Sequence, residues 1–83
     1  MLTIKVLGPG CENCKRLVWL AERAANHLNI EAEIIKVTEY PAIMAYNILS
    51  TPGLVINEKV VSAGRIPSEA EITTWLTDAL ETV

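Results

Sequence analysis

The chain has 83 residues, of which 51% are hydrophobic and 20% charged, and its formal net charge is −3. That length holds one hydrophobic core, so we expect a single domain over residues 1–83. The composition excludes a disordered chain, the acidic balance offers no basic surface to a nucleic acid, and no stretch approaches the roughly 20 apolar residues of a membrane span.

The first half of the chain predicts a strand, a long helix and a second strand. Residues 2–7 are apolar and β-branched and end at the sequence GPG, which is typical of a strand followed by a turn. Apolar side chains then recur at helical spacing over residues 12–27, and residues 31–37 repeat the strand pattern. The expected apolar positions of the helix are Leu17, Val18, Ala21, Ala24, Ala25 and Leu28. The first apolar run is too short and broken for a signal peptide, so we expect a cytoplasmic protein.

A short helix is expected after the second strand. Thr38 is placed to cap it, and Pro41 lies in its first turn, where a missing N–H group costs nothing. The helix is expected to fade near Asn47. Its predicted inward-facing side chains are Tyr40, Ile43 and Met44.

A hairpin and a final helix complete the chain. Residues 54–56 predict a short buried strand, NEK a tight turn, and residues 60–61 the start of the returning strand. Ser68 and Glu71 stand in S-x-x-E order, which is typical of a capping box at a helix start. The helix that follows is expected to reach Glu81, with the apolar stripe Ile72, Trp75, Leu76, Ala79 and Leu80.

The predicted order of elements is β-α-β-α-β-β-α, an α/β arrangement. Two strands joined through a helix imply a parallel pair with a right-handed crossover, whereas the hairpin strands must be antiparallel. One mixed four-stranded sheet flanked by three helices, with helices on both faces, is the most economical packing.

Both cysteines stand in GPGCENCKRL, where the first strand gives way to the first helix. A disulfide across so short a loop removes little chain entropy, so a stabilising staple explains the pair poorly, and redox chemistry or metal binding remains. Unpaired N–H groups at a helix start favour a thiolate at Cys11, with Lys15 as further support, while Cys14 lies one turn inside and is expected to be buried and protonated. On the redox interpretation, Cys11 attacks a partner's disulfide and Cys14 resolves the mixed disulfide.

The alternative is a C-x-x-C metal carrier or sensor. A closed zinc site needs four ligands, and the chain offers two thiols. His27 lies thirteen residues beyond Cys14, which is about 20 Å along a helix, so it cannot complete the set. Metal binding would therefore need ligands from another chain, and metal-transport domains with this motif end in a strand rather than a helix. A redox-inert interaction domain is the third possibility.

Thr51-Pro52, just before the strand at 54–56, is the second candidate feature. Proline cannot donate to a sheet ladder, so it is tolerated where a strand begins. A cis bond here would turn the chain sharply and expose the backbone of Thr51. An extended substrate segment would then pair with that backbone beside Cys11.

Three stretches in this order, IKVLGPGCENCKRL, YNILSTPGLVINEKVV and SAGRIPSEAEITTWL, resemble the thioredoxin superfamily. More narrowly, they are similar to the small, glutaredoxin-sized redox disulfide proteins of bacteria and archaea. The resemblance spans most of the chain and implies a thioredoxin fold and a cis Pro52 facing a redox-active Cys11–Cys14 pair. It implies no metal and no cofactor beyond that disulfide. The candidate substrate-binding residues are then Gly10, Thr51, Pro52 and Gly64.

The implied activity is that of a thiol–disulfide oxidoreductase acting on protein disulfides. The expected partners are a protein disulfide and an upstream reductase or small-molecule thiol, and we expect a monomer. Glu12-Asn13 stands between the cysteines in place of the Gly-Pro of typical thioredoxins, which leaves the reduction potential open.

Further departures concern the neighbouring positions. Gly10 replaces the tryptophan that usually precedes the first cysteine, and the buried acid of thioredoxins has no counterpart. Lys5 or water is therefore the expected route for the Cys14 proton. The loop AGR lacks the acid that follows the Gly-Gly pair of glutaredoxins, so no strong glutathione site is expected.

Overall fold

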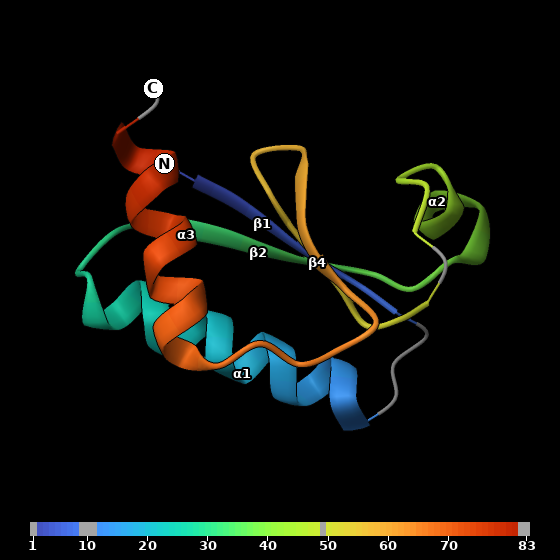
Figure 1. The fold of residues 1–83 in the computed structure, drawn as a ribbon, viewed down its shortest axis with the longest axis horizontal. Helices are drawn as coiled ribbons and strands as arrows, with labels where there is room; N and C mark the ends of the chain where they lie inside the picture. Colours follow the sequence, from blue (N-terminus) through green and yellow to red (C-terminus); the bar gives the residue numbers. More distant parts are fainter. Residues whose placement is uncertain (1, 9–11, 49, 82–83) are drawn as a thin grey trace.

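The computed structural model describes residues 2–8, 12–48 and 50–81. Its elements, in chain order, are β1 (Leu2–Leu7), α1 (Glu12–His27), β2 (Ala32–Val37), α2 (Tyr40–Met44), β3 (Gly53–Ile56), β4 (Lys59–Ala63) and α3 (Glu69–Glu81) (Figure 1). This is the predicted β-α-β-α-β-β-α order. None of these described helices is long and apolar enough to cross a membrane.

The four strands form one mixed sheet in the order β2-β1-β3-β4. β1 runs parallel to β2, with Leu2 opposite Ala32 and Val6 opposite Lys36. β1 also pairs antiparallel with β3, and β3 pairs antiparallel with β4. The predicted parallel pair, antiparallel hairpin and four-stranded mixed sheet are therefore confirmed.

The hairpin turn between β3 and β4 has two residues, not the three expected. Asn57 and Glu58 both adopt positive φ angles, 49° and 67°, as the primed turns of two-residue hairpins require. Asn57 is also tied to the sheet, because its N–H donates to the carbonyl of Thr3 at 2.9 Å and its Oδ1 accepts from the Thr3 N–H at 3.1 Å. Lys59 is therefore released from the turn and begins β4.

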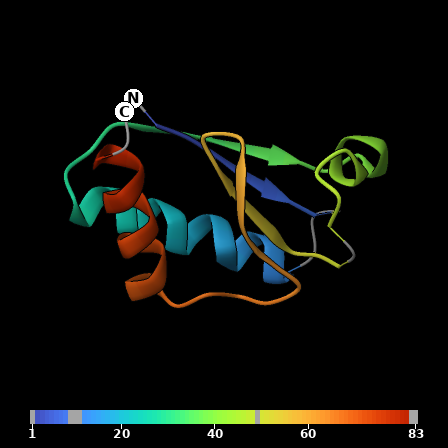
Figure 2. The ribbon, with the colours of Figure 1, turned by 45° about the horizontal axis from the view of Figure 1, so that its top comes forward.

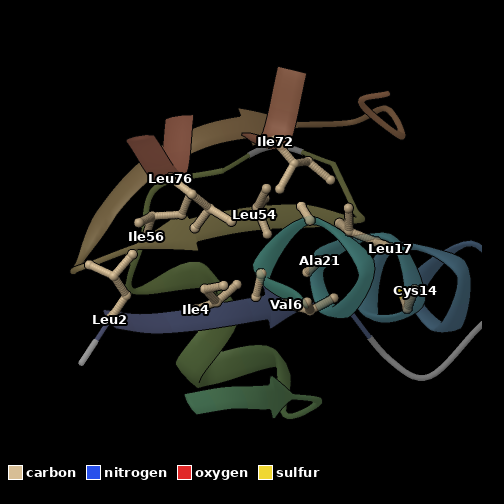
Figure 3. Close-up of a cluster of buried hydrophobic side chains, with 12 residues drawn as sticks. Leu2, Ile4, Val6, Cys14, Leu17, Ala21, Leu54, Ile56, Ile72 and Leu76 are labelled. Carbon is tan, nitrogen blue, oxygen red and sulfur yellow. The ribbon is translucent and has the colours of Figure 1, made fainter. Parts of the chain in front are cut away.

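One face of the sheet carries the larger part of the core. α1 and α3 lie side by side across that face (Figure 2). Alternate residues of a strand face the same side, so β1 and β3 each direct every second side chain toward these helices. The buried cluster that results includes Leu2, Ile4, Val6, Leu17, Ala21, Leu54, Ile56, Ile72 and Leu76, together with Cys14 (Figure 3).

The opposite face carries a smaller cluster beneath α2, which lies past the carboxyl ends of β1 and β2 (Figure 2). Its buried members are Leu7, Ile43, Ile48 and Val55. Helices on both faces of the sheet are thus confirmed.

The details predicted for α2 are partly wrong. Ile43 is buried as expected, but Met44 is 57% exposed and Tyr40 is also exposed, because a five-residue helix turns only one such position toward the sheet. The residue before the helix is Glu39, which makes no side-chain capping bond, so Thr38 does not cap it. The helix ends at Met44, three residues before the predicted end, and turns continue to Asn47, which adopts a φ of 58°.

The capping box ahead of α3 is confirmed. The Glu71 N–H donates to Ser68 Oγ at 3.2 Å, and the Ser68 N–H donates to Glu71 Oε1 at 3.4 Å. Ile72 and Leu76 are buried, but Leu80 is exposed. Trp75 and Ala79 pack against the buried cluster, so Leu80 alone of the expected apolar stripe turns away from it.

Candidate functional site

Two of the predicted site residues, Gly10 and Cys11, lie outside the described residues. The position of the attacking thiol and its distance from Pro52 therefore stay predictions. Cys14, Thr51, Pro52 and Gly64 are all described, and they mark the end of the molecule where β1 gives way to α1.

Cys14 lies in the first turn of α1 and is 5% exposed, so its predicted burial is confirmed. Its side chain belongs to the same core cluster as Val6 and Leu17 (Figure 3). Gly8, the residue after β1, lies directly against it, because a β-carbon on Gly8 would collide with Cys14 Sγ. The Gly8 N–H donates to the Val37 carbonyl at 2.9 Å, which fixes this part of the backbone to the end of β2.

The Thr51-Pro52 bond is cis, as the resemblance implied. Pro52 is buried and Thr51 is half-buried. Thr51 approaches the same point as Cys14, since its Cβ lies 3.8 Å from the place where a β-carbon on Gly8 would stand. The structure therefore brings Thr51 and Cys14 together around the backbone of Gly8.

Gly64 is connected to this segment through the backbone. Its N–H donates to the carbonyl of Pro52 at 2.9 Å, and its φ is +79°. A side chain at Gly64 would be strained at that φ and would also meet Ser50 Oγ. Glycine at this position thus allows the loop before α3 to lie close to the loop that carries Pro52.

A small cavity of about 60 Å³ opens beside Cys14. Its lining residues are Val6, Gly8, Cys14, Lys15, Val18, Lys36 and Thr38. Gly8, Lys36 and Thr38 were not predicted as site residues. The parallel register places Lys36 opposite Val6. Because Val6 packs in the same cluster as Cys14, this pairing explains why the end of β2 lies near the cysteine.

Lys5 was expected as a route for the Cys14 proton, and this is wrong. Its Nζ lies 2.5 Å from Glu58 Oε1 and donates to Tyr46 Oη at 2.9 Å, contacts that raise the pKa of Lys5 to about 12. These partners lie on the α2 side of the sheet, because side chains alternate along β1. Val6, not Lys5, faces Cys14.

Comparisons with known proteins agree with this geometry. The family model for the thioredoxin domain matches residues 2–77. A thioredoxin of Methanocaldococcus jannaschii is 36% identical over 98% of this chain and 93% of its own length. A thioredoxin of Methanothermobacter thermautotrophicus is 35% identical over 87% of this chain and 94% of its own length.

Two solved structures show the same fold. Thioredoxin 1 of Thermosipho africanus has a TM-score of 0.60 at 24% identity, and covers 96% of each chain. The oxidised thioredoxin of Plasmodium falciparum has a TM-score of 0.60 at 18% identity over 94% of this chain and 80% of its own. The match over most of the sequence, the shared fold and the cis proline together place this chain in the thioredoxin family, whose members are thiol–disulfide oxidoreductases.

Proposed function

We propose that this protein exchanges electrons with protein disulfides through Cys11 and Cys14. The observation that carries the proposal is the position of Cys14, buried in the first turn of α1 against Gly8 and close to the Thr51-Pro52 segment. Because a thiol buried in the first turn of a helix is shielded from free molecules, it can react only with a sulfur that is held next to it.

The reaction takes place in two exchange steps. The Cys11 thiolate attacks one sulfur of the partner's disulfide, a Cys11–partner bond forms, and the other partner sulfur leaves as a thiolate. Cys14 loses its proton and attacks Cys11 Sγ, which releases the second partner sulfur as a thiolate. The partner has then gained two electrons, and Cys11–Cys14 is a disulfide that an upstream reductase or a small-molecule thiol reduces again.

The partner is expected to dock as an extended segment along Thr51. The backbone of Thr51 would pair with this segment, and Gly10 and Gly64 are proposed as further contacts. Hydrogen bonding of Gly64 to the Pro52 carbonyl supports this proposal, because it holds the two loops in one place.

The experiment is a trapping assay with single-cysteine variants. Cys14→Ser should still attack and should accumulate a mixed disulfide with a disulfide-bonded protein. Cys11→Ser should not, since its remaining thiol is buried. Equal trapping by the two variants would show that the roles are assigned wrongly.

The oxidation state of the unmodified protein provides a second readout. Mass spectrometry should find an oxidised form that is lighter by the two lost hydrogens and that a dithiol reverses fully. Stoichiometric metal retained through purification, with no reversible oxidation, would contradict the proposal and favour a metal carrier.

A further inference from the structure

The charged side chains that line the cavity beside Cys14 are positive. Two lysines, Lys15 and Lys36, line it, and no carboxylate is among the described residues that do so. The volume of about 60 Å³ exceeds the roughly 10–15 Å³ that one water molecule requires. The cavity is thus large enough for water to reach the cysteine.

The sheet register explains why Lys36 lies on the cysteine side. Lys36 is paired with Val6 in the parallel β1–β2 ladder, and opposite residues of a ladder share one face of the sheet. Val6 packs in the same cluster as Cys14. The Lys36 side chain therefore leaves β2 on the face that α1 covers, and meets Lys15 at the cavity.

Other charged groups of α1 and β2 do not line the cavity. Glu12 and Arg16 are each two residues from Cys14, a spacing that places them off its face of the helix, whereas Glu12 is three residues from Lys15 and neighbours it on the helix surface. Arg16 lines a separate groove with Glu71. Lys5 is bound to Glu58 on the far side of the sheet.

Glu39 is the acid that lies near Lys36 at the end of β2. It shares a second hollow with Lys36 but does not line the cysteine cavity. No ion pair to Lys15 or Lys36 occurs within the part of the chain that the structure describes. The charge of the two lysines is therefore directed at the cavity and at solvent.

We propose that Lys36, assisted by Lys15, is a positioning residue that stabilises the Cys14 thiolate when Cys14 resolves the mixed disulfide. The proton of the Cys14 thiol passes to water in the cavity, and the ammonium groups stabilise the negative sulfur left behind. That sulfur forms the bond to Cys11 Sγ, and the partner's sulfur leaves with the electron pair of the broken bond. The inference rests on the proposed function, and it lets Cys14 ionise to water in a chain where the sequence offers no counterpart of the buried acid of thioredoxins.

The test isolates the Cys14 thiol in a Cys11→Ser background and measures its titration by the ultraviolet absorbance of the thiolate. An opposite charge close to a thiol lowers its pKa, but solvent screens exposed lysines, so Lys36→Met should raise the Cys14 pKa by about half a unit. Lys36→Glu should raise it further, and Lys36→Arg should leave it unchanged. Lys15→Met should act in the same direction as Lys36→Met.

Lys59→Met is the matched control, because Lys59 is an exposed lysine at the start of β4 and does not line the cavity. It should leave the titration unchanged. High salt should reduce the effect of Lys36→Met, since screening weakens an exposed charge. Thermal unfolding of each variant verifies that it is folded.

The order of the variants decides between electrostatics and packing. If Met and Glu at position 36 give the same titration as Lys, or if Lys59→Met shifts it as much, the proposal is wrong. If Arg raises the pKa as much as Met does, the role of Lys36 is structural and the proposal is again wrong. No disulfide substrate enters this titration, so its failure is distinguishable from failure of the trapping assay.

A kinetic arm uses the protein with both cysteines. Below the thiol pKa, half a unit is about a threefold change in thiolate fraction. Release of a preformed mixed disulfide from Cys11 should therefore slow about threefold at neutral pH in Lys36→Met. Equal rates in the variant and the unmodified protein would overturn the role in resolution.

Discussion

The sulfur of Cys14 occupies the space in which a β-carbon on Gly8 would stand. The residue that follows β1 and the buried thiol of α1 are therefore matched to each other. Glycine is needed at this position for close approach rather than for an unusual backbone angle, since Gly8 is not among the residues with positive φ. The contact allows Cys14 to lie in the core and still border the cavity.

Gly8→Ala should impair both stability and disulfide resolution. The added methyl group forces Cys14 Sγ or the end of β1 to move, and overpacking of this kind costs about 1–3 kcal/mol. A small displacement of a reacting group can slow a reaction by roughly 100-fold, so release of the mixed disulfide should slow at least tenfold. Chemical denaturation and stopped-flow release measure the two effects.

Gly53→Ala is the control for this prediction. Its β-carbon would lie 2.8 Å from Ile48 Cδ1 and 3.4 Å from Leu7 Cδ1, which are ends of flexible side chains in the other cluster. It should destabilise the protein without slowing release. If both variants slow release equally once corrected for stability, the contact between Gly8 and Cys14 has no special role.

The order of elements was predictable because each one carries a periodic pattern that local physics enforces. Apolar spacing identified α1 over its full length, and Ser68 with Glu71 marked the start of α3. The position of Cys14 followed from the same reasoning, because a strand that ends in GPG leads directly into the helix.

Other features depend on pairing between distant segments, which no local pattern contains. The register that places Lys36 opposite Val6 is one such feature, and it locates the cavity. Alternation along β1 is different, since it was visible in the sequence. Ile4 and Val6 share one face, which leaves Lys5 on the other, and this would have excluded Lys5 as a partner of Cys14.

Ile43 and Met44 test the corrected orientation of α2. Ile43 is 2% exposed, and truncation of a buried isoleucine costs about 2–5 kcal/mol. Ile43→Ala should therefore destabilise the protein strongly. Met44→Ala should stay within about 0.5 kcal/mol, as exposed substitutions usually do. Urea denaturation separates the two, and similar losses would mean that both side chains are buried.

Ser68→Ala should weaken the start of α3. Its Oγ accepts from the Glu71 N–H, and removal of such a cap typically costs about 1 kcal/mol. In a domain of this size, that corresponds to a fall in Tm of about 4–8 °C. Thr74→Ala, at an exposed position within α3, is the control and should change Tm little. Alanine is the better helix former, so an equal fall in Tm in both variants would mean that the loss at position 68 does not come from the cap.

The Lys5–Glu58 ion pair should make stability depend on pH at both ends of the range. A hydrogen bond from Lys5 lowers the pKa of Glu58 below 4.5, so its contribution is present above that value and is lost as the pH falls through the folded pKa. Bonds to Glu58 and Tyr46 raise the pKa of Lys5 from 10.5 to about 12. The contribution of Lys5 is present below 10.5 and is lost as the pH rises through about 12.

Glu58→Gln measures the acid side of this dependence. At neutral pH the variant should unfold at a lower temperature than the unmodified protein, and the gap should close on acidification as Glu58 becomes protonated. The gap should be modest and should shrink in salt, because the Glu58 side chain is 64% exposed. Tyr46→Phe removes a hydroxyl that bonds to both partners but leaves both charges in place. Its effect on the unfolding temperature should therefore change less on acidification than the effect of Glu58→Gln. A Glu58→Gln gap that stays constant through the acid range would show that the carboxylate charge is not what stabilises this face of the sheet.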